Sequence, residues 1–302
     1  MNFKSTLPVI ALLFAFSGSI QAQEYAETWD RDIKVGTAVE KFDGEQLPCY
    51  TVAVCEAKQG AVRTLVMDQI KMRTEEKASK KKVMSAVQLD FPNMDVQGVD
   101  VKVKTDEEKK AETVNVYAAF NYDGKYISPS ETPKADEMAK EVMHNLGVIL
   151  NQSVVGAQIA ETESALELQK KKHDAYIKEK EKLEKAPAEA EDAKLKLEGE
   201  RKKLEEKLTK AETKAASLQV SAEAATSTSK DINKYASAKK SVTSLEGKLL
   251  KNDENVKKVE QKLAEAEQEL PDAISTVEES QAMIDTLTEK LAKLNTKYDA
   301  IK

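Results

Sequence analysis

Few residues in this chain have the type and spacing that metal binding requires. The 302 residues include two histidines, and His144 follows Glu141 at the Glu-x-x-His spacing. This spacing places both side chains on one helical face, as in the di-iron sites of helical bundles. Such a site needs a second pair of the same kind, but Lys170 stands three positions before His173. We therefore predict no metal site, with His144 bordering a packing face and His173 a tolerated polar residue.

The chain also lacks the patterns of a nucleophile or a phosphate loop. It has neither a Gly-rich phosphate-binding loop nor a Gly-x-Ser-x-Gly elbow. Cys49 and Cys55 flank a segment typical of a strand, residues 50–54, which would separate them by about 20 Å. A disulfide requires Cα atoms within about 7 Å, so we favour core thiols or links to another chain over the alternative of a local disulfide. We predict no catalytic residue, no cofactor and no enzyme activity.

The N-terminal residues are typical of a signal peptide. Lys4 supplies a positive charge, residues 9–16 are apolar, and Ala22 is a small residue before a cleavage point. We expect cleavage near Ala22, so that residues 1–22 are removed and the protein is periplasmic or otherwise exported. The apolar stretch is too short for a transmembrane helix. We expect neither a transmembrane segment nor a lipid anchor.

The charge of the chain argues against nucleic acid as a partner. The formal net charge is −6, and both parts that follow the signal are mildly acidic: −4 for residues 23–133 and −3 for residues 134–302. Nucleic-acid-binding proteins carry a basic patch or stripe. We therefore expect protein partners of unknown identity.

Residues 23–133 have the pattern of an α+β head domain. Two strands, 33–41 and 47–55, are joined at Asp43-Gly44, a strong hairpin signal. A helix is predicted over 60–74 because apolar residues recur there at helical spacing. Alternating segments then predict strands at 83–89, 99–103, 114–120 and 125–128. The expected order is ββαβββ(β)α, a small antiparallel sheet covered by helix.

Residues 134–302 have the composition of a long all-α coiled-coil stalk, rich in Ala, Glu, Lys and Leu. From Val242 onwards every seventh residue is apolar, which is typical of a coiled coil. Residues 221–231 are rich in hydroxyls, without a large apolar side chain, and the heptad phase changes across them. We predict an antiparallel helical hairpin with arms of about 134–220 and 232–302 and a tip at about 221–231. Pairing between two chains, giving a homo-oligomer, stays an alternative.

Three polar or helix-breaking residues interrupt the predicted arms. Pro187 and Pro271 lie inside them, at equal distances from residue 229. We favour a hairpin kinked at one level by both prolines over four shorter helices separated by turns. Asn252 interrupts the apolar seam, where it either specifies the register or tolerates partial exposure.

Three functions are compatible with this organisation. The first is a non-catalytic exported coiled-coil protein that acts as a scaffold, spacer or adaptor in the cell envelope. The second is a periplasmic holdase, because the layout of a small β-containing body with long helical arms resembles that of the Skp type of chaperone. That resemblance implies client capture by arms that are positively charged in the family, whereas this stalk carries −3. The third is a head that binds a small ligand or a peptide, with the stalk used for dimerisation.

Overall fold

The structure is a computed structural model that describes residues 28–74, 79–80, 82–91, 96–109, 112–130, 132–224 and 228–302. The predicted signal peptide lies outside these residues. Contacts between residues divide the chain into two compact units. The first unit reaches to Ala165 and also includes Leu287–Lys302, and the second comprises Leu166–Thr286. The expected domain boundary at residue 133 stays a prediction. Within the described ranges, no helix combines the length and the apolar character that crossing a bilayer demands.

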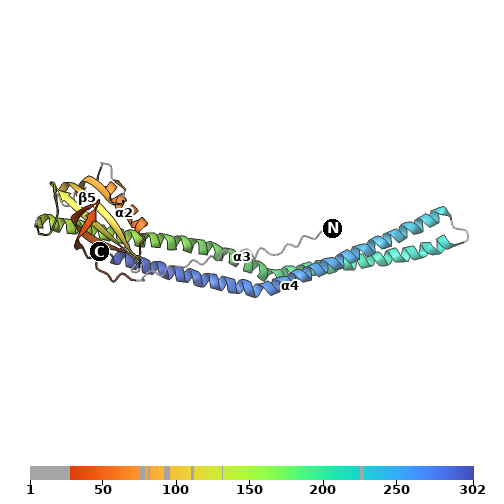
Figure 1. The fold of residues 1–302 in the computed structure, drawn as a ribbon. Helices are drawn as coiled ribbons and strands as arrows, with labels where there is room; N and C mark the ends of the chain where they lie inside the picture. The colour runs from red at the N-terminus through yellow and green to blue at the C-terminus, as the bar shows by residue number, and fades with distance from the viewer. Residues whose placement is uncertain are drawn as a thin grey trace. The chain divides into compact units, whose positions relative to one another are not determined.

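The first unit contains an antiparallel sheet (Figure 1). Its strand order is β1-β2-β6-β5-β4-β3, and β7 pairs with β6. The strands are β1 Gly36–Phe42, β2 Glu45–Cys55, β3 Ser79–Lys80, β4 Met84–Phe91, β5 Val96–Glu108, β6 Thr113–Tyr122 and β7 Lys125–Tyr126, and the helix α2 spans Gln59–Lys71. The predicted α+β head is confirmed.

The hairpin at Asp43-Gly44 forms as predicted. Phe42 pairs with Glu45, which leaves the two residues of the turn between β1 and β2. Both have positive φ, 46° at Asp43 and 102° at Gly44. This backbone matches the twist of the flanking strands, and aspartate and glycine adopt it readily.

Two strands differ from their predicted extents. β5 continues beyond the predicted end at residue 103, because Lys104 to Glu108 stay paired with β6 despite their charge. β3 was not predicted, since two residues are too short for an alternating pattern. Neither difference changes the order of the larger elements.

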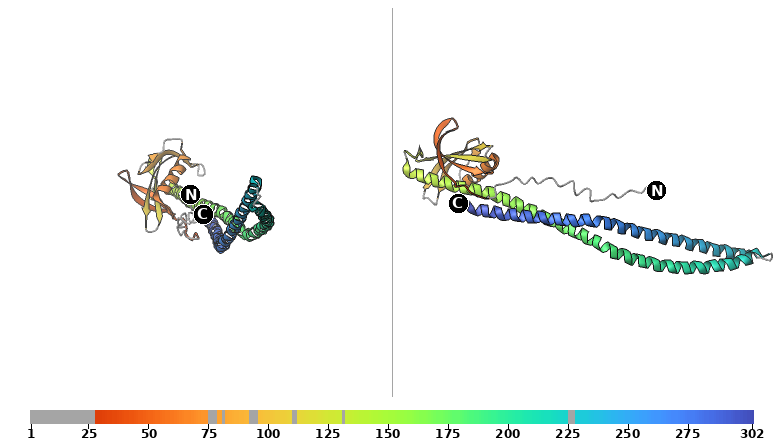
Figure 2. Two further views of the ribbon diagram at one scale, coloured as in Figure 1. Left: turned by 90° about the vertical axis from the view of Figure 1, so that its right-hand side faces the viewer. Right: turned by 90° about the horizontal axis from the view of Figure 1, so that it is seen from below.

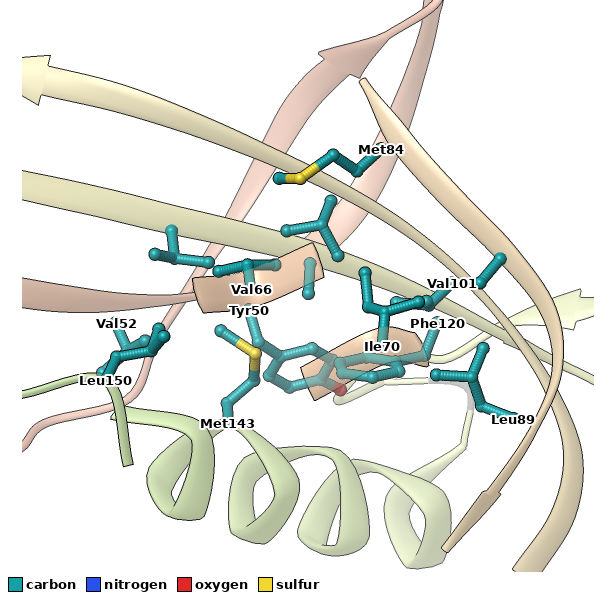
Figure 3. Packing of buried hydrophobic residues seen from close by; sticks show 14 of the residues in the cluster. Tyr50, Val52, Val66, Ile70, Met84, Leu89, Val101, Phe120, Met143 and Leu150 are labelled. Atoms are coloured by element: carbon teal, nitrogen blue, oxygen red, sulfur yellow. The ribbon is translucent and has the colours of Figure 1, made fainter. Parts of the chain in front are cut away.

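One face of the sheet carries the main core. Apolar side chains of β2, β4, β5 and β6 pack against α2 and the first turns of α3 (Pro133–Glu223), as Figure 3 shows for Tyr50, Val52, Phe120 and Met143. The opposite face holds a smaller cluster: Phe42, Leu47, Cys49, Val83 and Ala119.

The helix α3 begins at Pro133, the first helical position predicted from the sequence. The carbonyl of Thr132 accepts the first helical bond, from the amide of Asp136 at 2.8 Å. The Thr132 hydroxyl, however, accepts from the amide of Ser128 and donates to its carbonyl, so it stabilises the preceding turn rather than capping the helix.

The predicted helical hairpin is confirmed. In the second unit, α3 and α4 (Ser229–Ala300) lie side by side and antiparallel (Figures 1 and 2). Pro187 and Pro271 both lie inside continuous helices, so the alternative of four shorter helices is wrong.

The two prolines do not lie at one level. Lys194 contacts Glu260, and Asn252 donates to the carbonyl of Leu197. Extended to Pro187, the first contact places residue 267 opposite it and the second places residue 262 there. Pro271 is therefore displaced from the level of Pro187 by about one to two and a half helical turns. The equal distances from residue 229 misled the prediction, since the arms pair with an offset that the sequence does not reveal.

Candidate functional site

The residues that the sequence suggested for metal chemistry do not converge. Glu141 is exposed on α3, while His144 is half-buried. His173 is half-buried in the second unit, and its buried Nδ1 has no hydrogen-bond partner among the described residues. Over the same residues, no cluster of three or more His, Cys, Asp and Glu side chains could hold a metal ion.

Both cysteines are buried, free thiols. Burial, reinforced by the nearby Glu40 carboxylate, raises the pKa of Cys49 to about 11, so this thiol stays protonated at neutral pH. Cys55, at the end of β2, accepts a hydrogen bond from Nη1 of Arg31 at 3.0 Å. These two environments are those of core residues.

A close contact joins α3 to the sheet at Gly147. A Cβ at this position would lie 2.5 Å from Cγ2 of Val52 and 2.7 Å from Cγ2 of Ile33. Only glycine fits here, because real Cβ atoms do not approach neighbours so closely. At this glycine, α3 thus packs closely against the side chain of Val52 on β2.

One turn later, Asn151 binds the part of β2 that β1 does not reach. Its Nδ2 donates to the carbonyls of Ala53 and Gly147 at 3.0 and 2.8 Å, and its Oδ1 accepts from the amide of Cys55 at 3.0 Å. β1 pairs with β2 only as far as Thr51. A buried side chain therefore supplies the hydrogen bonds that a strand would supply.

A third contact fixes the start of α3. The hydroxyl of Tyr50 donates to Oδ1 of Asp136 at 2.8 Å, and Lys140 donates to Oδ2 at 2.7 Å. Burial works against the charged carboxylate, but these two hydrogen bonds outweigh it and lower the pKa of Asp136. Burial, and then the bond to Asp136, raise the pKa of Tyr50.

The last residues of the chain pack on the same unit. Nζ of Lys297 lies 2.6 Å from Oε2 of Glu56, and the Lys297 side chain is only 1% exposed. Gln158 also donates to Glu56, at 3.1 Å. Trp29 packs against the adjacent cluster of Val155, Leu294 and Ile301. The C-terminal segment of α4 is therefore an integral part of the first unit.

The main core contains a cavity that is open to solvent. It has a volume of about 440 Å³ and lies between α2, strands β4 to β6 and α3. Its walls are mostly aliphatic and aromatic, with Gln69, Arg73 and Asn145 as polar members. This size and composition are those of small-molecule sites.

A second, more polar cavity lies near the N-terminal end of α2. Its volume is about 710 Å³, and its walls carry charges of both signs, including Glu56, Lys58, Glu107 and Lys109. Gln158 lines it and has a buried Oε1 without a hydrogen-bond partner among the described residues. Mixed charge gives this cavity no clear preference for a ligand.

In the second unit, polar contacts fix the pairing of the arms. Asn252 is 4% exposed and donates to the carbonyl of Leu197 at 3.1 Å. Gln169 donates to Ser280 at 3.0 Å, and Arg201 forms an ion pair with Asp253 at 2.9 Å. The burial of Asn252 favours its register-specifying role over partial exposure.

Comparison with known proteins identifies no relative. No family model, no curated protein and no solved structure matches the chain.

The sequence indicated one of these polar contacts and missed the others. Asn252 stood out because it interrupts an apolar repeat. Asn151 and Lys297 follow no such repeat, and their partners are up to 241 residues away. The cavity was missed because its walls have the same apolar pattern as a filled core.

Proposed function

We propose that this protein is a non-catalytic scaffold, spacer or adaptor of the cell envelope, with the helical hairpin as its interaction element. One observation carries the proposal: the arms of the second unit are uninterrupted helices that pair in a defined register. From Leu166 to Glu223, one arm measures about 85 Å at 1.5 Å per residue. Such a hairpin offers a long surface to other proteins.

The outer surface of the hairpin supports contacts with soluble protein segments. It is dominated by charged residues, including exposed ion pairs such as Arg201 with Glu205. Single apolar residues stand among them, with Leu195 60% and Leu250 66% exposed. Interfaces of this mixed character are typical of reversible association.

Photocrosslinking in intact cells tests the interaction role. A photoreactive amino acid replaces Leu195 or Leu250 on the hairpin, and Val39, 66% exposed on β1, serves as the matched control on the head. We expect both hairpin positions to crosslink to the same few envelope proteins, and the head position to give a different set. Identical products from all three positions, or none from the hairpin, would contradict the proposal.

Export is a separate part of the proposal, supported by the pattern of residues 1–22. Cell fractionation with N-terminal sequencing tests it. We expect the mature protein to begin near Gln23 and to leave the cytoplasm. A cytoplasmic chain that retains Met1 would refute export without touching the role of the hairpin.

The holdase function remains the second candidate, favoured by the layout of an α+β head with paired helical arms. An aggregation assay separates the two functions. An unfolded outer-membrane barrel protein is diluted from urea with an equimolar amount of this protein, and light scattering is followed. The scaffold proposal predicts scattering equal to that with serum albumin, whereas a holdase would suppress it.

A further inference from the structure

The cavity in the head has a composition that suits an apolar ligand. Its walls include Val66 and Ile70 of α2, Phe91 of β4 and Leu146 of α3. Figure 3 shows Ile70, Leu89, Val101 and Phe120 converging at one end of the core, next to α3. Water within such walls finds few hydrogen-bond partners, so apolar cavities favour apolar occupants.

The volume sets the size of the occupant. A cavity of about 150 Å³ with apolar walls accommodates benzene. At about 440 Å³, this cavity has room for roughly a dozen carbon atoms or more. A hydrocarbon chain fits this requirement better than a single small ring.

Arg73 gives the cavity its charge. This residue lies just after the end of α2. Its backbone amide donates to the carbonyl of Ile70 at 2.9 Å, and its backbone carbonyl accepts from the amide of Asp90 at 3.1 Å. Its backbone is therefore fixed to both α2 and β4, on the wall of the cavity.

The Arg73 guanidinium retains donors for a ligand. Its Nη1 donates to the carbonyl and to Oε1 of Gln69, at 2.8 and 3.0 Å. No carboxylate among the described residues forms an ion pair with Arg73. An arginine presents five N–H donors in a planar fork that matches a carboxylate, so an anionic head group is the complementary partner.

We propose that the head cavity binds a single-chain amphiphile, a long-chain carboxylate whose hydrocarbon tail enters the core and whose head group pairs with Arg73. The proposal is independent of the hairpin function and gives the ligand-binding head a specific chemistry. Gln69 is a positioning residue, since it holds the guanidinium from α2. No covalent step is involved.

Calorimetric titration of the full mature chain with dodecanoate, below its micelle concentration, tests the proposal. We expect saturable binding of one molecule per chain and at least tenfold weaker binding of dodecanol, which has the same tail without the charge. Arg73→Gln should weaken dodecanoate binding about tenfold and leave dodecanol binding unchanged. Arg63→Gln is the matched control on α2, outside the cavity, and should bind dodecanoate normally.

A second variant tests the position of the tail. Leu146→Trp fills the cavity from the half-buried face of α3 and should abolish binding of both molecules. Circular dichroism establishes that each variant is folded. Absence of saturable dodecanoate binding to the unaltered protein overturns the proposal, as does equal binding by Arg73→Gln. Binding of a phospholipid but not of dodecanoate would also overturn it.

Discussion

Gly147 is the residue at which α3 comes closest to the sheet. We predict that Gly147→Ala lowers the free energy of unfolding of the first unit by about 1–3 kcal/mol, because the added methyl group would overlap Val52 and Ile33. Urea unfolding followed by the fluorescence of Trp29, the single tryptophan, measures this change.

Gly199 provides the control, since it lies in the same helix and an added Cβ there would meet no atom within 4 Å. Gly199→Ala should not lower stability, and it should raise helix stability by up to about 1 kcal/mol. If both substitutions changed the free energy of unfolding in the same direction, the close contact at Gly147 would not be the reason that this position requires glycine.

Asn151 illustrates how a single side chain replaces a strand. Asn151→Leu keeps the volume but leaves the amide of Cys55 and the carbonyl of Ala53 without this partner. Each buried unpaired group costs about 1–3 kcal/mol, so we expect a loss of about 2–4 kcal/mol in urea unfolding. Asn233→Leu, an exposed substitution on α4, should change stability by no more than about 0.5 kcal/mol. Equal effects would refute the role of the Asn151 hydrogen bonds.

At the scale of elements, the two internal prolines weaken the helices that contain them. Pro187 and Pro271 are exposed, so replacement by alanine restores a backbone hydrogen bond without disturbing packing. We expect each substitution to stabilise the hairpin by up to about 3 kcal/mol, measured by circular dichroism during thermal unfolding. Pro133→Ala is the control, since proline is favourable at the first helical position and its loss should give no gain.

We predict that Asn252 lowers the stability of the hairpin and, in return, specifies a single register of the two arms. Its Oδ1 is buried without a partner among the described residues, so Asn252→Leu should stabilise the hairpin by about 1–2 kcal/mol. The variant should also associate, because the uniform apolar seam no longer rejects other pairings. Thermal unfolding and multi-angle light scattering measure the two effects, with Asn233→Leu as the exposed control. A variant that is stabilised yet keeps the oligomeric state of the parent would refute the specificity role.

The elements themselves were largely predictable. Alternation defined the main strands, and the heptads defined the arms, because each pattern is local and repeated. The register of the arms was not predictable, since an offset of one or two turns costs few heptad contacts. The register depends on individual pairs such as Lys194 with Glu260 and Asn252 with Leu197. The cavity was not predictable either: whether apolar side chains fill the space between α2 and α3 depends on the distance between the helices.

At the scale of the whole molecule, one ion pair joins residues that are 241 positions apart. Lys297 and Glu56 lie 2.6 Å apart with side chains 1% and 14% exposed. Breaking a buried ion pair is costly, so Lys297→Met and Glu56→Gln should each lower the free energy of unfolding by about 3–5 kcal/mol. The double variant removes both charges. Its loss in the free energy of unfolding should therefore be smaller than the sum of the losses in the two single variants.

The exposed pair of Lys293 and Glu289 provides the control on the same helix. Lys293→Met with Glu289→Gln should change stability by less than about 1 kcal/mol, because solvent screens exposed pairs. Urea unfolding followed by Trp29 suits both experiments, since Trp29 packs against the cluster of Leu294 and Ile301. Additive losses at Glu56 and Lys297 would show that the two residues contribute to stability separately and not as an ion pair.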